Sequence, residues 1–201
     1  MSPDMSTVTR QATTPTERQR EILGLAVDLV AEHGYAALTM RALARASGMK
    51  LGALQYHFRT SEALLRALAA YIAEAYRASF GTLRTAGDPP TLRAVVDHLF
   101  DDAAGETLHS DRLWPQLWAM ARVEPVMREL LEDIHREYLA MLEEALERAG
   151  RTAPRAEALA LMALVEGSTL FVGREAPWAA DAEAVREVLL RLVDDEARRG
   201  Q

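Results

Sequence analysis

The sequence contains no cysteine and only one lysine, Lys50, among its 23 basic residues. Without cysteine the chain can form no disulfide, no thiolate zinc site and no thiol nucleophile. No apolar run approaches the roughly 20 residues that a membrane-spanning helix needs. Residues 1–16 also lack the apolar segment of a secretory signal peptide. We therefore expect a cytoplasmic protein without a membrane partner.

Motifs of common enzymes are also missing from the sequence. It has no glycine-rich phosphate loop, no GxSxG nucleophile elbow and no HExxH zinc motif. Its histidines are not paired at metal-ligand spacing, and carboxylates such as Glu132 and Glu143 are typical of solvated helix faces. We expect no enzymatic activity, no cofactor and no metal site.

Charge is divided unevenly along a chain whose formal net charge is −7. Residues 1–59 hold seven basic and five acidic residues, so this segment carries +2 and the remainder −9. A DNA-binding segment followed by a segment that avoids DNA would show such a division. Chance divides charge similarly in many two-domain proteins, so this observation favours DNA binding without deciding it.

Hydrophobic residues recur at helical spacing in nearly every segment after residue 14, and no segment alternates as a strand does. The predicted fold class is therefore all-α, with about nine helices. Residues 1–14 are polar and rich in threonine, which predicts a disordered tail. Residues 15–60 and 61–201 form the two predicted domains.

Residues 39–58, TMRALARASGMKLGALQYHF, have the pattern of two short helices joined by a glycine turn. Thr39 is a good helix N-cap, and Gly48 permits the tight turn. Leu54 and Phe58 lie four residues apart, as core contacts of a helix do. A helix-turn-helix places its second helix in the major groove of DNA, so we expect the remaining residues of this helix to face DNA.

The outward side chains of this segment suit base edges and phosphates. Gln55 can pair bidentately with adenine, Lys50 or Arg41 can donate to guanine, and Leu51 or Ala53 can contact a thymine methyl. Gly52 allows the backbone to come close to DNA, and the helix N-terminus at Thr39 favours a phosphate. For His57, a helix-capping role is equally open. The predicted DNA-binding residues are Thr39, Arg41, Lys50, Leu51, Gly52, Ala53, Gln55, Tyr56 and His57.

The window YAALTMRALARASGMKLGALQYHFRTSEALL resembles the N-terminal domain of the TetR family of bacterial transcriptional regulators. The resemblance implies a helix-turn-helix DNA-binding domain on residues 15–60 and a ligand-binding and dimerisation domain on residues 61–201. LWPQLWAMA and the helix after it are similar to the subgroup of the betaine-pathway repressor. The expected function is that of a homodimeric repressor, released from a palindromic double-stranded operator by a small-molecule effector. Effector, operator and the choice between repression and activation stay open.

The resemblance has local departures that bear on DNA contacts. The family often has Ser or Thr at Lys50 and an aromatic residue at Gln55. It commonly has a phosphate-binding lysine at Ser61, a contact that Arg59 could replace here.

The predicted helix near residues 154–171 contains ALALMALVEG, which leaves it with little polar face. Surface helices normally have one, so we expect this helix and the last one to form a two-fold dimer interface, built as a four-helix bundle. Burial in the chain's own core is the alternative. The predicted interface residues are Leu159, Met162, Ala163, Glu166, Val185, Val188, Leu189 and Leu192.

Aromatic, methionine and polar residues of the second domain are candidates for binding the effector. Trp114 and Trp118, four residues apart, suit an apolar ligand or, through cation–π contact, a cationic one. Glu166 is either a counter-charge for that ligand or a polar group of the interface. Core packing is the simpler interpretation for each candidate taken singly. The predicted set is His98, Phe100, Trp114, Trp118, Tyr138, Met141, Met162 and Glu166.

Overall fold

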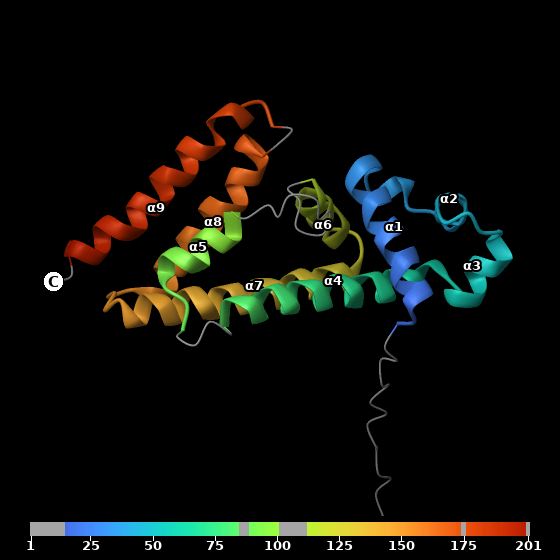
Figure 1. The fold of residues 1–201 in the computed structure, drawn as a ribbon, viewed down its shortest axis with the longest axis horizontal. Helices are drawn as coiled ribbons and strands as arrows, with labels where there is room; N and C mark the ends of the chain where they lie inside the picture. The colour runs from blue at the N-terminus through green and yellow to red at the C-terminus, as the bar shows by residue number, and fades with distance from the viewer. Residues whose placement is uncertain (1–14, 85–88, 101–111, 174–175, 200–201) are drawn as a thin grey trace, which may run out of the picture.

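The computed structural model describes residues 15–84, 89–100, 112–173 and 176–199, which form nine α-helices and no strand (Figure 1). The all-α prediction is confirmed for these residues, while the tail predicted at residues 1–14 lies outside them. None of the described helices is long and apolar enough to cross a membrane. The helices are α1 (Glu17–His33), α2 (Met40–Ala46), α3 (Leu51–His57), α4 (Ser61–Arg84), α5 (Leu92–Phe100), α6 (Leu113–Ala121), α7 (Pro125–Arg148), α8 (Pro154–Val172) and α9 (Ala182–Arg199).

Local sequence explains where the first helices begin and end. The Thr16 hydroxyl accepts the Gln19 backbone N–H while the Gln19 side chain accepts the Thr16 N–H, and this capping box starts α1. Gly34, with a φ of 77°, ends it. Thr39 caps α2 as predicted, and Thr60 caps α4 through the N–H three residues on.

The head, which we define as α1–α3, and the body, α4–α9, share one continuous hydrophobic core. Ile22 and Leu54 in the head and Leu117 and Leu142 in the body are fully buried. Within the body, α4 and α7 lie side by side, and α6 packs between α1 and α7 (Figure 1). Because α4 and α6 both contact α1, the head rests directly on helices of the body.

Candidate DNA interface and effector site

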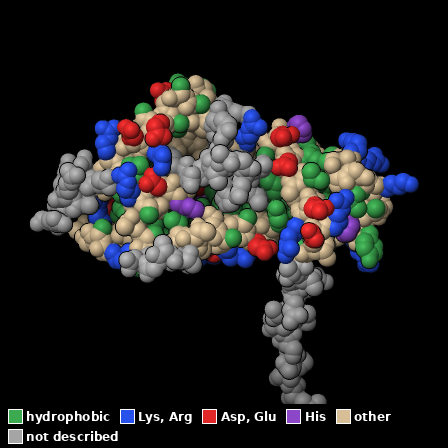
Figure 2. Space-filling model, in the orientation of Figure 1, with side chains coloured by type: hydrophobic (Ala, Val, Ile, Leu, Met, Phe, Trp, Pro, Cys, Tyr) green, Lys and Arg blue, Asp and Glu red, His purple; other side chains and the backbone are tan. Residues whose placement is uncertain are grey.

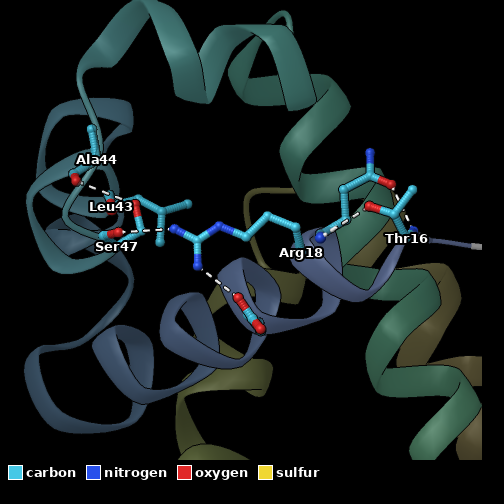
Figure 3. Close-up of polar contacts among 7 residues, drawn as sticks. Thr16, Arg18, Leu43, Ala44 and Ser47 are labelled. Carbon is cyan, nitrogen blue, oxygen red and sulfur yellow. Dashed lines mark hydrogen bonds and ion pairs between the residues drawn. The ribbon is translucent and has the colours of Figure 1, made fainter.

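The turn between α2 and α3 is held by hydrogen bonds within the end of α2 and from α1 (Figure 3). Gly48 has a φ of 65°, which only glycine adopts without strain. The Ser47 hydroxyl donates to the carbonyls of Leu43 and Ala44, at 2.8 and 3.2 Å. Arg18 of α1 donates to the Ser47 carbonyl at 3.2 Å, so α1 helps to set the angle between α2 and α3.

The second helix of this motif, α3, buries one face and exposes the other. Leu54 and Phe58 are buried, as predicted, whereas the ring of Tyr56 is 87% exposed. Leu51 and His57 are half-buried, and the His57 ring packs edge-on against Tyr56. The other predicted DNA-binding residues are exposed: Thr39, Arg41, Lys50, Gly52, Ala53 and Gln55. Basic side chains gather at this end of the molecule (Figure 2), which gives the exposed face a charge suited to phosphates.

In the body, the Glu166 carboxylate of α8 has hydrogen-bond partners on two other helices. The indole N–H groups of Trp114 and Trp118, both on α6, donate to Oε2, the second at 3.0 Å. His135 of α7 places its Nε2 3.1 Å from Oε1. Only 22% of the Glu166 side chain and 15% of the His135 side chain are exposed.

The Glu166 carboxylate stays ionised although it is largely buried. Burial raises its pKa, but the hydrogen bonds from His135, Trp114 and Trp118 outweigh burial, so the pKa lies below its usual value of 4.5. A buried carboxylate without such donors would gain a proton instead. The site therefore holds a negative charge at neutral pH.

Aromatic rings form a second layer around this carboxylate. Tyr76 of α4 lies 5.6 Å from Trp114, and Phe80 packs edge-on against Tyr138 at 4.5 Å, both measured between ring centroids. Burial raises the pKa of Tyr76 and of Tyr138, and the nearby Glu166 charge raises both further, so both phenols are neutral. We call this set, Glu166, His135, Trp114, Trp118, Tyr76, Phe80 and Tyr138, the aromatic cluster.

The aromatic cluster contains some of the predicted effector-binding residues and omits others. Trp114, Trp118 and Glu166 are in direct contact, and Tyr138 lies in the second layer. His98 instead places its Nε2 2.8 Å from the Ser79 hydroxyl, between α4 and α5. Of the two predicted methionines, Met141 is buried in the core and Met162 is half-buried against it. The Phe100 side chain lies outside what the structure describes.

Sequence reasoning missed three members of the aromatic cluster: His135, Tyr76 and Phe80. The sequence predicted a DNA contact for His57 and an effector contact for His98, whereas His135 was considered only as a possible metal ligand. No group of three metal-binding side chains occurs in the described residues. His135 lies three residues before Tyr138 and four after Leu131, on the inward face of α7. That spacing to two buried residues indicates that the His135 ring faces the core.

The outer sides of α8 and α9 carry exposed apolar residues, as the predicted interface requires. Leu159, Ala163, Val188 and Leu192 are exposed, and Met162 and Val185 are half-buried. The prediction needs correction at two positions. Leu189 is only 5% exposed because it packs within the chain, and Glu166 points inward to α6 and α7. Further exposed apolar side chains extend the face: Leu164, Leu170 and Phe171.

Two protein families match this chain. Residues 22–68 match the family described as bacterial regulatory proteins, tetR family, and residues 89–198 match the BetI-type transcriptional repressor, C-terminal. A similar protein is the HTH-type transcriptional regulator BetI of Ectopseudomonas mendocina (strain ymp). It is 26% identical over 184 residues, which cover 88% of this chain and 92% of the relative.

Solved structures of regulators are similar over most of the chain. A TetR-family regulator from Rhodococcus sp. is 26% identical with a TM-score of 0.71, covering 90% of this chain and 100% of its own. A transcriptional regulator from Saccharomonospora viridis, in complex with choline, shares the fold with a TM-score of 0.74 and 22% identity. The match covers 90% of this chain and 97% of that protein's chain. The chain therefore belongs to the TetR family of bacterial regulatory proteins, with a C-terminal part of the BetI type, and is a DNA-binding transcriptional regulator rather than an enzyme.

Proposed function

We propose that this protein is a homodimeric repressor that leaves a palindromic operator when a small organic cation binds in its body. The observation that carries the proposal is the ionised, largely buried Glu166 carboxylate, which lies among the rings of the aromatic cluster. Three hydrogen bonds hold this charge in place, and an organic cation would add the opposite charge that a buried carboxylate attracts.

The composition of the aromatic cluster favours a cation over other effectors. The faces of indole and phenol rings attract cations, and a quaternary ammonium group is recognised in this way because it has no N–H to donate. An anionic effector would be repelled by Glu166. The choline complex of the Saccharomonospora viridis protein, which shares this fold, supports the same class.

The head supports operator binding by two copies of the chain. Each α3 exposes Gly52, Ala53, Gln55 and Tyr56 of the predicted contact residues. Two such helices fit successive major grooves when they lie about 34 Å apart. The exposed apolar face of α8 and α9 offers a self-complementary surface for the two-fold pairing that a palindromic site requires.

The helix α6 supports coupling between the aromatic cluster and the head, because it takes part in both. Trp114 and Trp118 bind Glu166 from one side of α6, while Gln116 packs against Gly34, where an added Cβ would lie 3.3 Å from its Oε1. Glu124, just after α6, accepts a hydrogen bond from the Tyr35 hydroxyl. Burial, with this hydrogen bond, raises the pKa of Tyr35 to about 12, so the phenol remains a donor.

An effector that shifts α6 would therefore move the head. A 100-fold loss of operator affinity requires the effector to favour the released state by about 2.7 kcal/mol. One charge-assisted contact at Glu166, with cation–π contacts to indole faces, is of that order.

The test uses fluorescence anisotropy of an operator selected from genomic fragments, with choline chloride added against potassium chloride at equal ionic strength. Equal ionic strength matters because salt alone weakens DNA binding. Choline should lower the operator affinity of the wild type by about tenfold or more. Glu166→Gln should bind the operator normally and not respond, whereas Glu144→Gln, at an exposed position of α7, should respond as the wild type does. Equal release of Glu166→Gln would remove the assigned site.

A further inference from the structure

His135 has the surroundings that the proposed effector cation would need. Its Nε2 lies 3.1 Å from Oε1 of Glu166, and its ring centroid lies 5.2 Å from that of Trp118, with 32° between the planes. The Trp114 ring approaches it edge-on at 5.8 Å. Cation–π contact acts within about 6 Å of a ring centroid, so a protonated His135 would be held by a carboxylate and an indole face together.

We propose that His135 is a built-in competitor of the effector: its imidazolium takes the place of the organic cation beside Glu166, and effector affinity rises as His135 loses its proton. This inference rests on the proposed function, and it adds a specificity-determining residue to that site. It makes the regulator respond to effector concentration and pH together.

The direction of the pH effect follows from the groups around His135. Histidine side chains generally change charge between about pH 5 and 8. Glu166 on α8 is ionised throughout this range, because its pKa lies below 4.5. Tyr76 on α4 and Tyr138 on α7 are neutral, the indoles of α6 do not titrate, and Glu132, one turn earlier on α7, is exposed.

Among the described residues around this site, His135 is the side chain that can place a positive charge beside Glu166. In acid, the effector must displace an imidazolium from the carboxylate, and this competition weakens binding. In alkali, a neutral imidazole offers Glu166 only one hydrogen bond and no opposite charge, so the effector binds more tightly. Effector binding then releases a proton from His135, and by linkage affinity rises with pH by up to about tenfold per pH unit.

The experiment titrates choline and tetramethylammonium into the full-length protein between about pH 5.5 and 8.5, the range in which histidine titrates. Tryptophan fluorescence reports binding, since two tryptophans contact Glu166. We expect the affinity of the wild type for these cations to rise about tenfold from the acid to the alkaline end of this range. His135→Gln should bind them with an affinity that does not depend on pH and that exceeds the wild-type affinity most at acid pH. The matched control is His98→Gln, at the histidine that contacts Ser79, which should keep the wild-type pH profile.

Calorimetry of the wild type in buffers of different ionisation enthalpy adds a readout that needs no variant. Proton release on binding within this pH range supports the competition, and its absence overturns it. A flat wild-type profile, or the same slope in His135→Gln, would also overturn this inference while leaving the cationic effector in place. If neither cation binds at any pH, the effector class proposed above fails together with the competition.

Discussion

The fold of the isolated protein does not require glycine at position 52. This is the strongest sign of DNA contact at the level of single residues. The φ of Gly52 is not positive, and a Cβ added there would meet nothing within 4 Å. Glycine inside a helix is destabilising by roughly 0.5–1 kcal/mol relative to alanine. Gly52→Ala should therefore raise the free energy of unfolding by about that amount in urea titrations.

The same Gly52→Ala substitution should weaken operator binding by about tenfold, because its methyl group would enter the space into which DNA approaches. The contrasting variant is Gly48→Ala, at a φ of 65°, which should lower stability by about 1–2 kcal/mol. Unchanged operator affinity of a stabilised Gly52→Ala protein would show that α3 does not approach DNA at this position.

Residues close in sequence were predictable and distant pairings were not. Thr39, Gly48, Leu54 and Phe58 adopt the expected roles because caps, turns and i,i+4 faces depend on a few neighbouring residues. The meeting of Glu166 with Trp118 joins positions 48 residues apart. This contact depends on how α8 packs against α6, which no pattern of neighbouring residues in the sequence predicts.

At the scale of elements, α6 matters more than its nine residues indicate. It contacts α1 on one side and α7 and α8 on the other, so it joins the aromatic cluster to the head. Its sequence predicted the tryptophan pair but not its contact with α1. That contact depends on where α4 and α7 place α6, which the spacing within α6 cannot reveal.

Removal of the Tyr35–Glu124 hydrogen bond tests the link between the head and the turn that joins α6 to α7. Tyr35→Phe deletes the hydroxyl that donates to Glu124 and should cost about 1 kcal/mol of stability. We expect Tyr35→Phe to bind choline with wild-type affinity. The factor by which choline lowers operator affinity should be severalfold smaller in this variant than in the wild type. Operator anisotropy with and without choline measures this coupling. Tyr71→Phe, on the half-buried face of α4, is the control, and coupling equal to wild type in Tyr35→Phe would exclude this link.

At the scale of the whole molecule, the two ends of the chain have different surfaces. The head exposes basic and small polar residues on α2 and α3, whereas α8 and α9 expose leucines and a phenylalanine. Large apolar patches on a monomer normally mark an interaction surface. A second copy is the partner we expect, since one two-fold axis through this face pairs both heads on a symmetric operator.

Charged substitutions on that face should separate the two copies and thereby weaken operator binding. Leu164 and Leu192 are about half exposed, at 47% and 50%, so Leu164→Glu with Leu192→Glu should leave the protomer folded. In the dimer these carboxylates would be buried without partners, at a cost of several kcal/mol. Light scattering with size exclusion should give the mass of one chain, and operator affinity should fall about 100-fold because two linked heads bind with avidity. Ala140→Glu, exposed on α7, should remain dimeric, and a dimeric double variant with full operator affinity would place the interface elsewhere.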